Sequence, residues 1–108
     1  MYEASALKDE SLRLSVEIMR ILENKHVRMH AADYRGAAAH LMETLRVMGI
    51  VRLLHLARSR HAVLSDAAEA VLFELRCDHL VDESELRTDA ARLTAELIAR
   101  LKSRSSRV

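Results

Sequence analysis

The chain has 108 residues, of which half are hydrophobic and 31% are charged, so it fits one domain with enough apolar surface for a core. It contains no Pro or Trp, two Gly, two Tyr and one Phe, and this composition excludes a sheet protein, because strands and turns are rich in those residue types. The formal net charge is +1, so positive and negative charges nearly balance. The three aromatic side chains offer little surface on which a nucleobase or a flavin can stack.

What remains is mostly Leu, Ala, Arg and Glu, which are good helix formers. The chain is therefore predicted to be all-α, a small bundle of four to five helices assembled as a dimer. Residues 1–101 are expected to form a single helical domain. Residues 102–108 are expected to form a basic, disordered tail.

The first helix is predicted over roughly residues 7–25. One face carries large aliphatic residues at helical spacing: Leu7, Leu14, Ile18, Ile21 and Leu22. The other side carries a second apolar stripe: Leu12, Val16 and Met19. A small bundle buries one stripe per helix, so the second stripe is predicted to be the dimer interface.

A second helix, or a rotated continuation of the first, is predicted over residues 29–48, and the pattern does not distinguish these alternatives. Its apolar positions are Tyr34, Ala37, Leu41, Leu45 and Met48. Gly49 predicts a stop, because glycine is the residue that most often follows a helix end. A short third helix follows, ending near residues 59–61, with Ile50, Leu53, Leu54 and Ala57 as its apolar positions.

Two capping-box spacings predict the starts of the last two helices. Asp66 and Glu69 indicate a fourth helix that continues to Leu80, and its core positions are predicted to be Ala67, Ala68, Val71 and Leu75. Asp82 and Glu85 indicate a fifth helix, whose apolar stripe is Leu86, Ala90, Leu93, Leu97 and Leu101.

The charges are unevenly distributed along the chain. The segment from Thr44 to His61 contains Arg but no acid, whereas the segment from Asp66 to Asp89 is mainly acidic. This contrast predicts helices paired by complementary charge, within one chain or between two. It also leaves open an alternative function as a small DNA-binding regulator that uses Arg46, Arg52, Arg58, Arg60, Lys102, Arg104 and Arg107 on phosphates.

A low-ranking alternative is a metal-binding bundle. On one continuous helix, four residues would lie along one side: Glu23, His26, His30 and Asp33. Carboxylate and imidazole groups are ligands for transition metals, although a second helix or a second subunit would have to complete the shell. The favoured interpretation is a solvated polar face that is broken by a helix boundary near residues 24–30, with no cofactor bound.

No phosphate-loop, dinucleotide, nucleophile-elbow or zinc signature occurs in the sequence, so no enzymatic activity is expected. No apolar stretch approaches the roughly 20 residues that span a bilayer, and no secretory signal is found at the start. The excess of Arg over Lys is typical of a high-GC bacterial genome. The leading hypothesis is a cytoplasmic bacterial interaction or regulatory protein, a homodimer that presents a helix surface to a protein partner.

Overall fold

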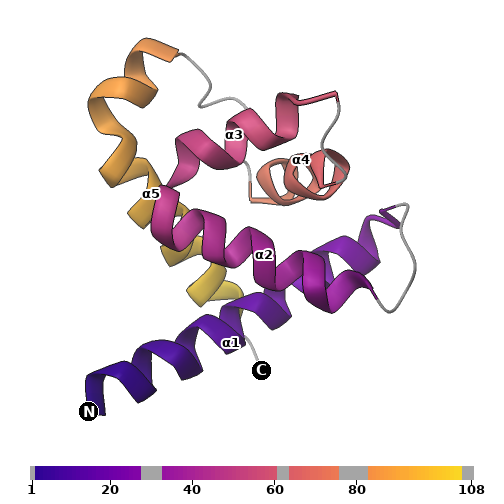
Figure 1. Cartoon of the computed structure of the whole chain (residues 1–108), viewed down its shortest axis with the longest axis vertical. Helices are drawn as coiled ribbons and strands as arrows, with labels where there is room; N and C mark the ends of the chain where they lie inside the picture. The colour runs from indigo at the N-terminus through magenta and orange to yellow at the C-terminus, as the bar shows by residue number, and fades with distance from the viewer. Residues whose placement is uncertain (1, 28–32, 61–63, 76–82, 106–108) are drawn as a thin grey trace.

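The computed structural model consists of helices joined by short connections (Figure 1). It describes residues 2–27, 33–60, 64–75 and 83–105, with residues 2–8 and 83–88 described as backbone only, and this part of the chain contains no strand. The helices are α1 (Tyr2–Asn24), α2 (Asp33–Met48), α3 (Ile50–Arg58), α4 (Ser65–Glu74) and α5 (Glu83–Ser105). The prediction of an all-α fold is confirmed. No helix in the described ranges is long and apolar enough to cross a membrane.

The helices α1 and α2 are separate, so α2 is a second helix and not a rotated continuation of the first. The backbone N–H of His26 donates to Glu23 O at 3.1 Å, and that of Val27 donates to Leu22 O at 3.2 Å. His26 has a φ of 52°, in the left-handed region. Together these features form a Schellman motif, which ends α1 and turns the chain away from the helix axis. The predicted end near residue 25 is therefore confirmed, although His occupies the position where Gly is usual.

The core draws aliphatic side chains from all five helices. On α1 the predicted inner face is confirmed at Leu14, Ile18, Ile21 and Leu22, which are all buried, while the side chain of Leu7 lies outside the described part. Four small residues are also buried and let the helices approach closely: Ala37, Ala38, Ala67 and Ala68. Met48, predicted to be a core position, is instead 63% exposed, because α2 ends there and the chain turns at Gly49.

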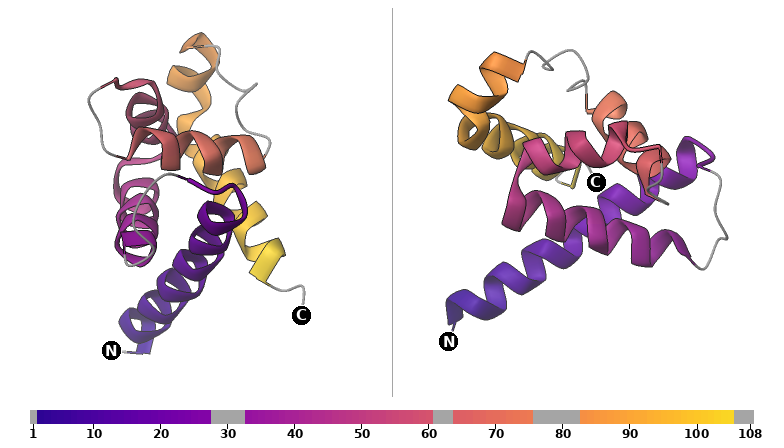
Figure 2. Two further views of the ribbon diagram at one scale, coloured as in Figure 1. Left: turned by 90° about the vertical axis from the view of Figure 1, so that its right-hand side faces the viewer. Right: turned by 45° about the horizontal axis from the view of Figure 1, so that its top comes forward.

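Each helix touches several others (Figure 2). The helix α2 packs between α1 and α3, α4 packs on α3 and α1, and α5 contacts both α1 and α3. The start of α1 and the end of α5 lie at the same end of the molecule, where Lys102 Nζ is 2.7 Å from Glu10 Oε1. The hydroxyl of Tyr34 donates to Val27 O at 2.8 Å, which holds the start of α2 against the end of α1.

The corner between α2 and α3 is held by a residue that lies far away in the sequence. Gly49 has a φ of 83°, and a Cβ added to it would lie 3.0 Å from Thr94 Oγ1. The same hydroxyl oxygen accepts the backbone N–H of Ile50 at 2.9 Å. The first N–H groups of a helix have no partner within that helix, so Thr94 on α5 acts as the cap that α3 lacks locally.

Several predicted boundaries are corrected. The helix α4 begins at Ser65, with Leu64 at its N-cap and no side-chain capping bond, so the capping box at Asp66 is wrong. It ends at Glu74 and not at Leu80, although the predicted core position Leu75 is buried. Asp82 lies outside the described residues.

The end of α5 also differs from the expectation. This helix continues to Ser105, whereas a disordered tail was expected from residue 102 onward. Lys102 and Arg104 therefore belong to its last turns, whereas Arg107 lies outside the described residues. The helix also contains a kink at Asp89, whose φ and ψ are −118° and 21°.

Replacing Thr94 tests the remote cap. Thr94→Val keeps the shape of the side chain but removes the acceptor of the Ile50 N–H, and a buried donor without a partner costs about 1–3 kcal/mol. We expect the free energy of unfolding, measured by urea denaturation, to fall by an amount in that range. Thr94→Ser is the matched control and should retain most of the stability. Equal losses in the two variants would contradict the capping role.

Replacing His26 tests the end of α1. The left-handed conformation is unfavourable for a residue with a Cβ, and Gly adopts it freely. We expect His26→Gly to raise the free energy of unfolding by roughly 0.5–1 kcal/mol relative to His26→Ala. The comparison with Ala removes the imidazole from both variants and isolates the backbone effect. A Gly variant no more stable than the Ala variant in thermal melts would show that the turn is not strained.

Candidate functional site

The outer face of α1 carries an apolar stripe that is largely open to solvent, formed by Leu12, Val16 and Met19 and called here the α1 outer stripe. The spacing of i, i+4 and i+7 aligns the three side chains along one side of the helix. Leu12 is 58% exposed and Val16 is 40% exposed. Met19 is half-buried and packs against the edge of the core. The stripe thus continues from the core edge out into solvent.

Charged side chains lie next to this stripe. Asp9, Arg13, Arg20 and Glu23 are exposed residues of the same helix, so the stripe is an apolar strip with a polar border. The strip can therefore make hydrophobic contacts, and its border can make polar ones.

Another feature of α1 was not predicted from the sequence. Glu17 is 5% exposed, and its Oε1 accepts from Arg20 Nη1 at 2.8 Å. A buried carboxylate requires a charged or hydrogen-bonding partner, and Arg20 supplies one from the next turn. The i, i+3 spacing is visible in the sequence, but nothing in the sequence shows that Glu17 is buried.

The end of α4 is a meeting point of charged residues. Glu74 carboxylate oxygens lie 3.0 Å from Lys25 Nζ and 3.3 Å from Arg104 Nη1. The hydrogen bond from Lys25 is the main cause that lowers the pKa of Glu74 below its ordinary value of 4.5; the positive charges of Lys25 and Arg104 add to it, and partial burial opposes it. The carboxylate thus joins the end of α1 to the end of α5.

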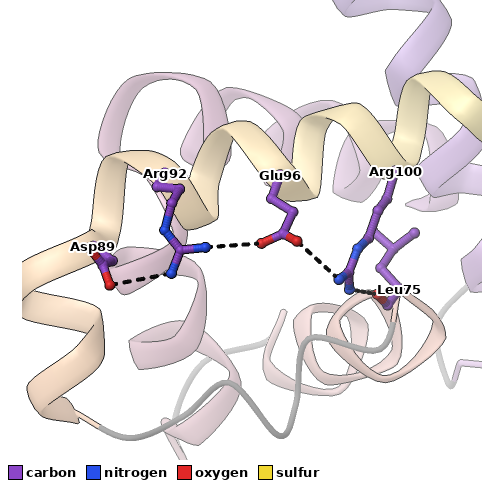
Figure 3. Close-up of polar contacts among 5 residues, drawn as sticks. All are labelled: Leu75, Asp89, Arg92, Glu96 and Arg100. Atoms are coloured by element: carbon purple, nitrogen blue, oxygen red, sulfur yellow. Dashed lines mark hydrogen bonds and ion pairs between the residues drawn. The ribbon is translucent and has the colours of Figure 1, made fainter.

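A ladder of charges leads along α5 to the same place (Figure 3). Arg92 Nη2 lies 3.3 Å from Asp89 Oδ2, and Arg92 Nη1 lies 3.9 Å from Glu96 Oε2. Glu96 Oε1 lies 3.5 Å from Arg100 Nη2. Arg100 Nη1 then donates to the backbone oxygen of Leu75 at 2.6 Å. A guanidinium at the C-terminal end of a helix satisfies a free carbonyl and opposes the negative end of the helix dipole. The ladder therefore anchors α5 to the end of α4.

The structure does not place the four predicted metal ligands on one helix. Glu23 belongs to α1, His26 lies in the left-handed turn and Asp33 begins α2, whereas His30 lies outside the described residues. The premise of a continuous helix is therefore wrong. Among the described residues, no group of three or more His, Cys, Asp or Glu side chains is arranged to hold a metal ion.

The basic residues proposed for DNA binding are dispersed. Arg46 is at the end of α2 and lies 2.8 Å from Glu43, and Lys102 and Arg104 of α5 pair with Glu10 and Glu74. The other described members, Arg52, Arg58 and Arg60, lie on α3 or just after it and are exposed. Intramolecular carboxylates therefore already neutralise part of this positive charge.

Comparison with known proteins gives no further assignment: no model of a protein family, no characterised protein and no solved structure matches this chain.

The pH dependence of stability tests the role of Glu74. Because its pKa is lowered in the folded state, the ionised carboxylate stabilises the fold above its ordinary value of 4.5, and this contribution is lost as the pH falls through the lowered pKa. We expect Glu74→Gln to be less stable at neutral pH by on the order of 1 kcal/mol. The difference from wild type should shrink steadily below pH 4.5 in urea denaturation. A difference independent of pH would assign the effect to packing.

Proposed function

We propose that the chain is a small helical protein-interaction or regulatory protein that forms a homodimer through the α1 outer stripe. In this proposal its role is carried by contacts with proteins and not by catalysis. The observation that supports it is the exposure of Leu12 and Val16, aligned on the face of α1 opposite to the one that fills the core.

A second copy of the chain is a suitable cover for this stripe. Two α1 helices that cross antiparallel beside a two-fold axis near Val16 would bring Leu12 of one copy against Met19 of the other. Each residue of the stripe is then used twice, as a two-fold interface requires. The half-buried Met19 offers a flexible side chain that adapts its shape to the opposing surface.

The size of the stripe limits the affinity. Full burial of a Leu or Val side chain contributes roughly 1.5–3 kcal/mol, and both residues already hide part of their surface. Association also loses at least about 4 kcal/mol of translational and rotational freedom. A micromolar dimer requires about −8 kcal/mol, so the stripe alone does not reach this affinity, and contacts made by the neighbouring charged side chains would have to supply the remainder.

The α1 dimer is tested by light scattering coupled to size-exclusion chromatography. We expect wild type, at micromolar concentration in a high-salt buffer that screens contacts driven by charge, to show about twice the chain mass of 12.2 kDa. Val16→Glu places a charge in the centre of the stripe, so it should remain at the mass of one chain, since burial of an unpaired carboxylate is strongly unfavourable.

Ala39→Glu introduces the same side chain at an exposed position of α2, outside the stripe and its charged border, and serves as the control. It should retain the dimer. Circular dichroism of each variant separates dissociation from loss of structure. A wild type that stays monomeric at every concentration, together with a folded and unchanged Val16→Glu, would disprove pairing through this face.

A further inference from the structure

A groove of about 360 Å³ lies beside α4, away from the α1 outer stripe. We call it the α4 groove, and its lining includes Lys25, Val27, Asp66, Glu69, Ala70 and Phe73. Phe73 is 59% exposed, and Lys25 Nζ lies 4.9 Å from the centre of its ring. Glu74 also pairs with Lys25 at 3.0 Å, which places the ammonium against one side of the ring. The groove thus presents an exposed aromatic ring to solvent.

The other border of the α4 groove is acidic. Asp66 and Glu69 follow the same outward face of α4 as Ala70 and Phe73, at i, i+3, i+4 and i+7. Both carboxylates are exposed, and neither has an ion pair within the described ranges. A ligand that fits must therefore combine an aliphatic side chain for the ring with neighbouring positive charges for the carboxylates.

The chain itself carries such a group at the corner between α2 and α3. This α2–α3 corner consists of Arg46, Val47, Met48 and Arg52 around the turn at Gly49. Val47 is 60% exposed and Met48 is 63% exposed, so two aliphatic side chains project between two arginines. Arg46 Nη2 lies 2.8 Å from Glu43 Oε1, whereas Arg52 has no ion pair within the described residues, so the charge complementary to the α4 groove comes mainly from Arg52.

The two surfaces cannot meet within one molecule. The corner is at the C-terminal end of α2, whereas the end of α1 lies beside the N-terminal end of α2 (Figure 1), where Val27 of the α4 groove accepts the hydrogen bond from Tyr34. A helix of 16 residues separates the two ends by about 24 Å. Each surface therefore remains open for another molecule.

We infer that the α4 groove receives the α2–α3 corner of a second copy of this chain. Met48 and Val47 would pack on Phe73 and Ala70, and the arginines would face Asp66 and Glu69. This contact joins two different surfaces, so it is a head-to-tail contact that extends from copy to copy unless a ring closes. It uses none of the α1 outer stripe and holds whether or not α1 forms a dimer.

Sedimentation velocity of the full chain over a range of concentrations tests this contact. In a corner variant, Arg46→Glu/Arg52→Glu, and in a groove variant, Asp66→Lys/Glu69→Lys, like charges would oppose each other. We expect wild type to form larger species as concentration rises, and these species to shrink with added salt. Each variant alone should lose this growth, with the dissociation constant raised at least about tenfold.

Mixing provides the decisive control, because each variant retains the surface that the other lacks. An equimolar mixture of the corner and groove variants should again form larger species. A chain carrying all four substitutions keeps the net charge of +1 and should also associate with itself, which excludes a general effect of charge. Met48→Gln should weaken association without any change of charge. Circular dichroism checks that every variant is folded.

The proposal is overturned if wild type sediments like the two charge variants, or if their mixture sediments as the sum of its components. The Val16→Glu variant tests the α1 dimer separately. It can still associate head to tail, whereas the corner variant can still pair through α1, so the two contacts are distinguishable.

Discussion

Burial of aliphatic side chains from all five helices in one core is the interaction on which the rest of this structure depends. Truncation of one buried Leu typically costs about 2–5 kcal/mol, whereas an exposed ion pair contributes about 0.2–1 kcal/mol. The core, not the charges, therefore accounts for most of the stability. Buried alanines on α2 and α4 allow the helices to lie close together, which compensates for the scarcity of aromatic rings.

Polar contacts then determine how α5 lies on this core. Thr94 accepts the first N–H of α3, Arg100 donates to the last carbonyl of α4, and Arg104 pairs with Glu74. The first two contacts satisfy backbone groups that the ends of two shorter helices leave free, and the third is an ion pair between side chains. Since α2, α4 and α5 all pack against α1, its inner face is covered and its outer face remains in solvent.

The proposed contacts differ in symmetry, and this difference decides what they can build. Pairing through α1 would be two-fold and would close at a dimer, whereas docking of the α2–α3 corner into the α4 groove would extend from copy to copy. Both contacts together would link dimers into larger assemblies. The exposed Asp66, Glu69 and Arg52 would make this growth sensitive to salt, and a protein that offers a similar basic apolar corner would compete for the same groove.

The helical class and the inner faces of the helices could be predicted from the sequence, because the 3.6-residue spacing of Leu14, Ile18 and Ile21 depends only on local geometry. The ends of α1 and α2 could also be predicted, near residue 25 and at Gly49. Only the structure showed that His26 takes the left-handed conformation at the end of α1, because Gly is the residue usually found there. The tertiary structure also decided that Thr94 caps α3 from 44 residues away and that Glu74 receives Lys25 and Arg104. Such contacts join positions that are close only after the core has formed, so no local spacing records them.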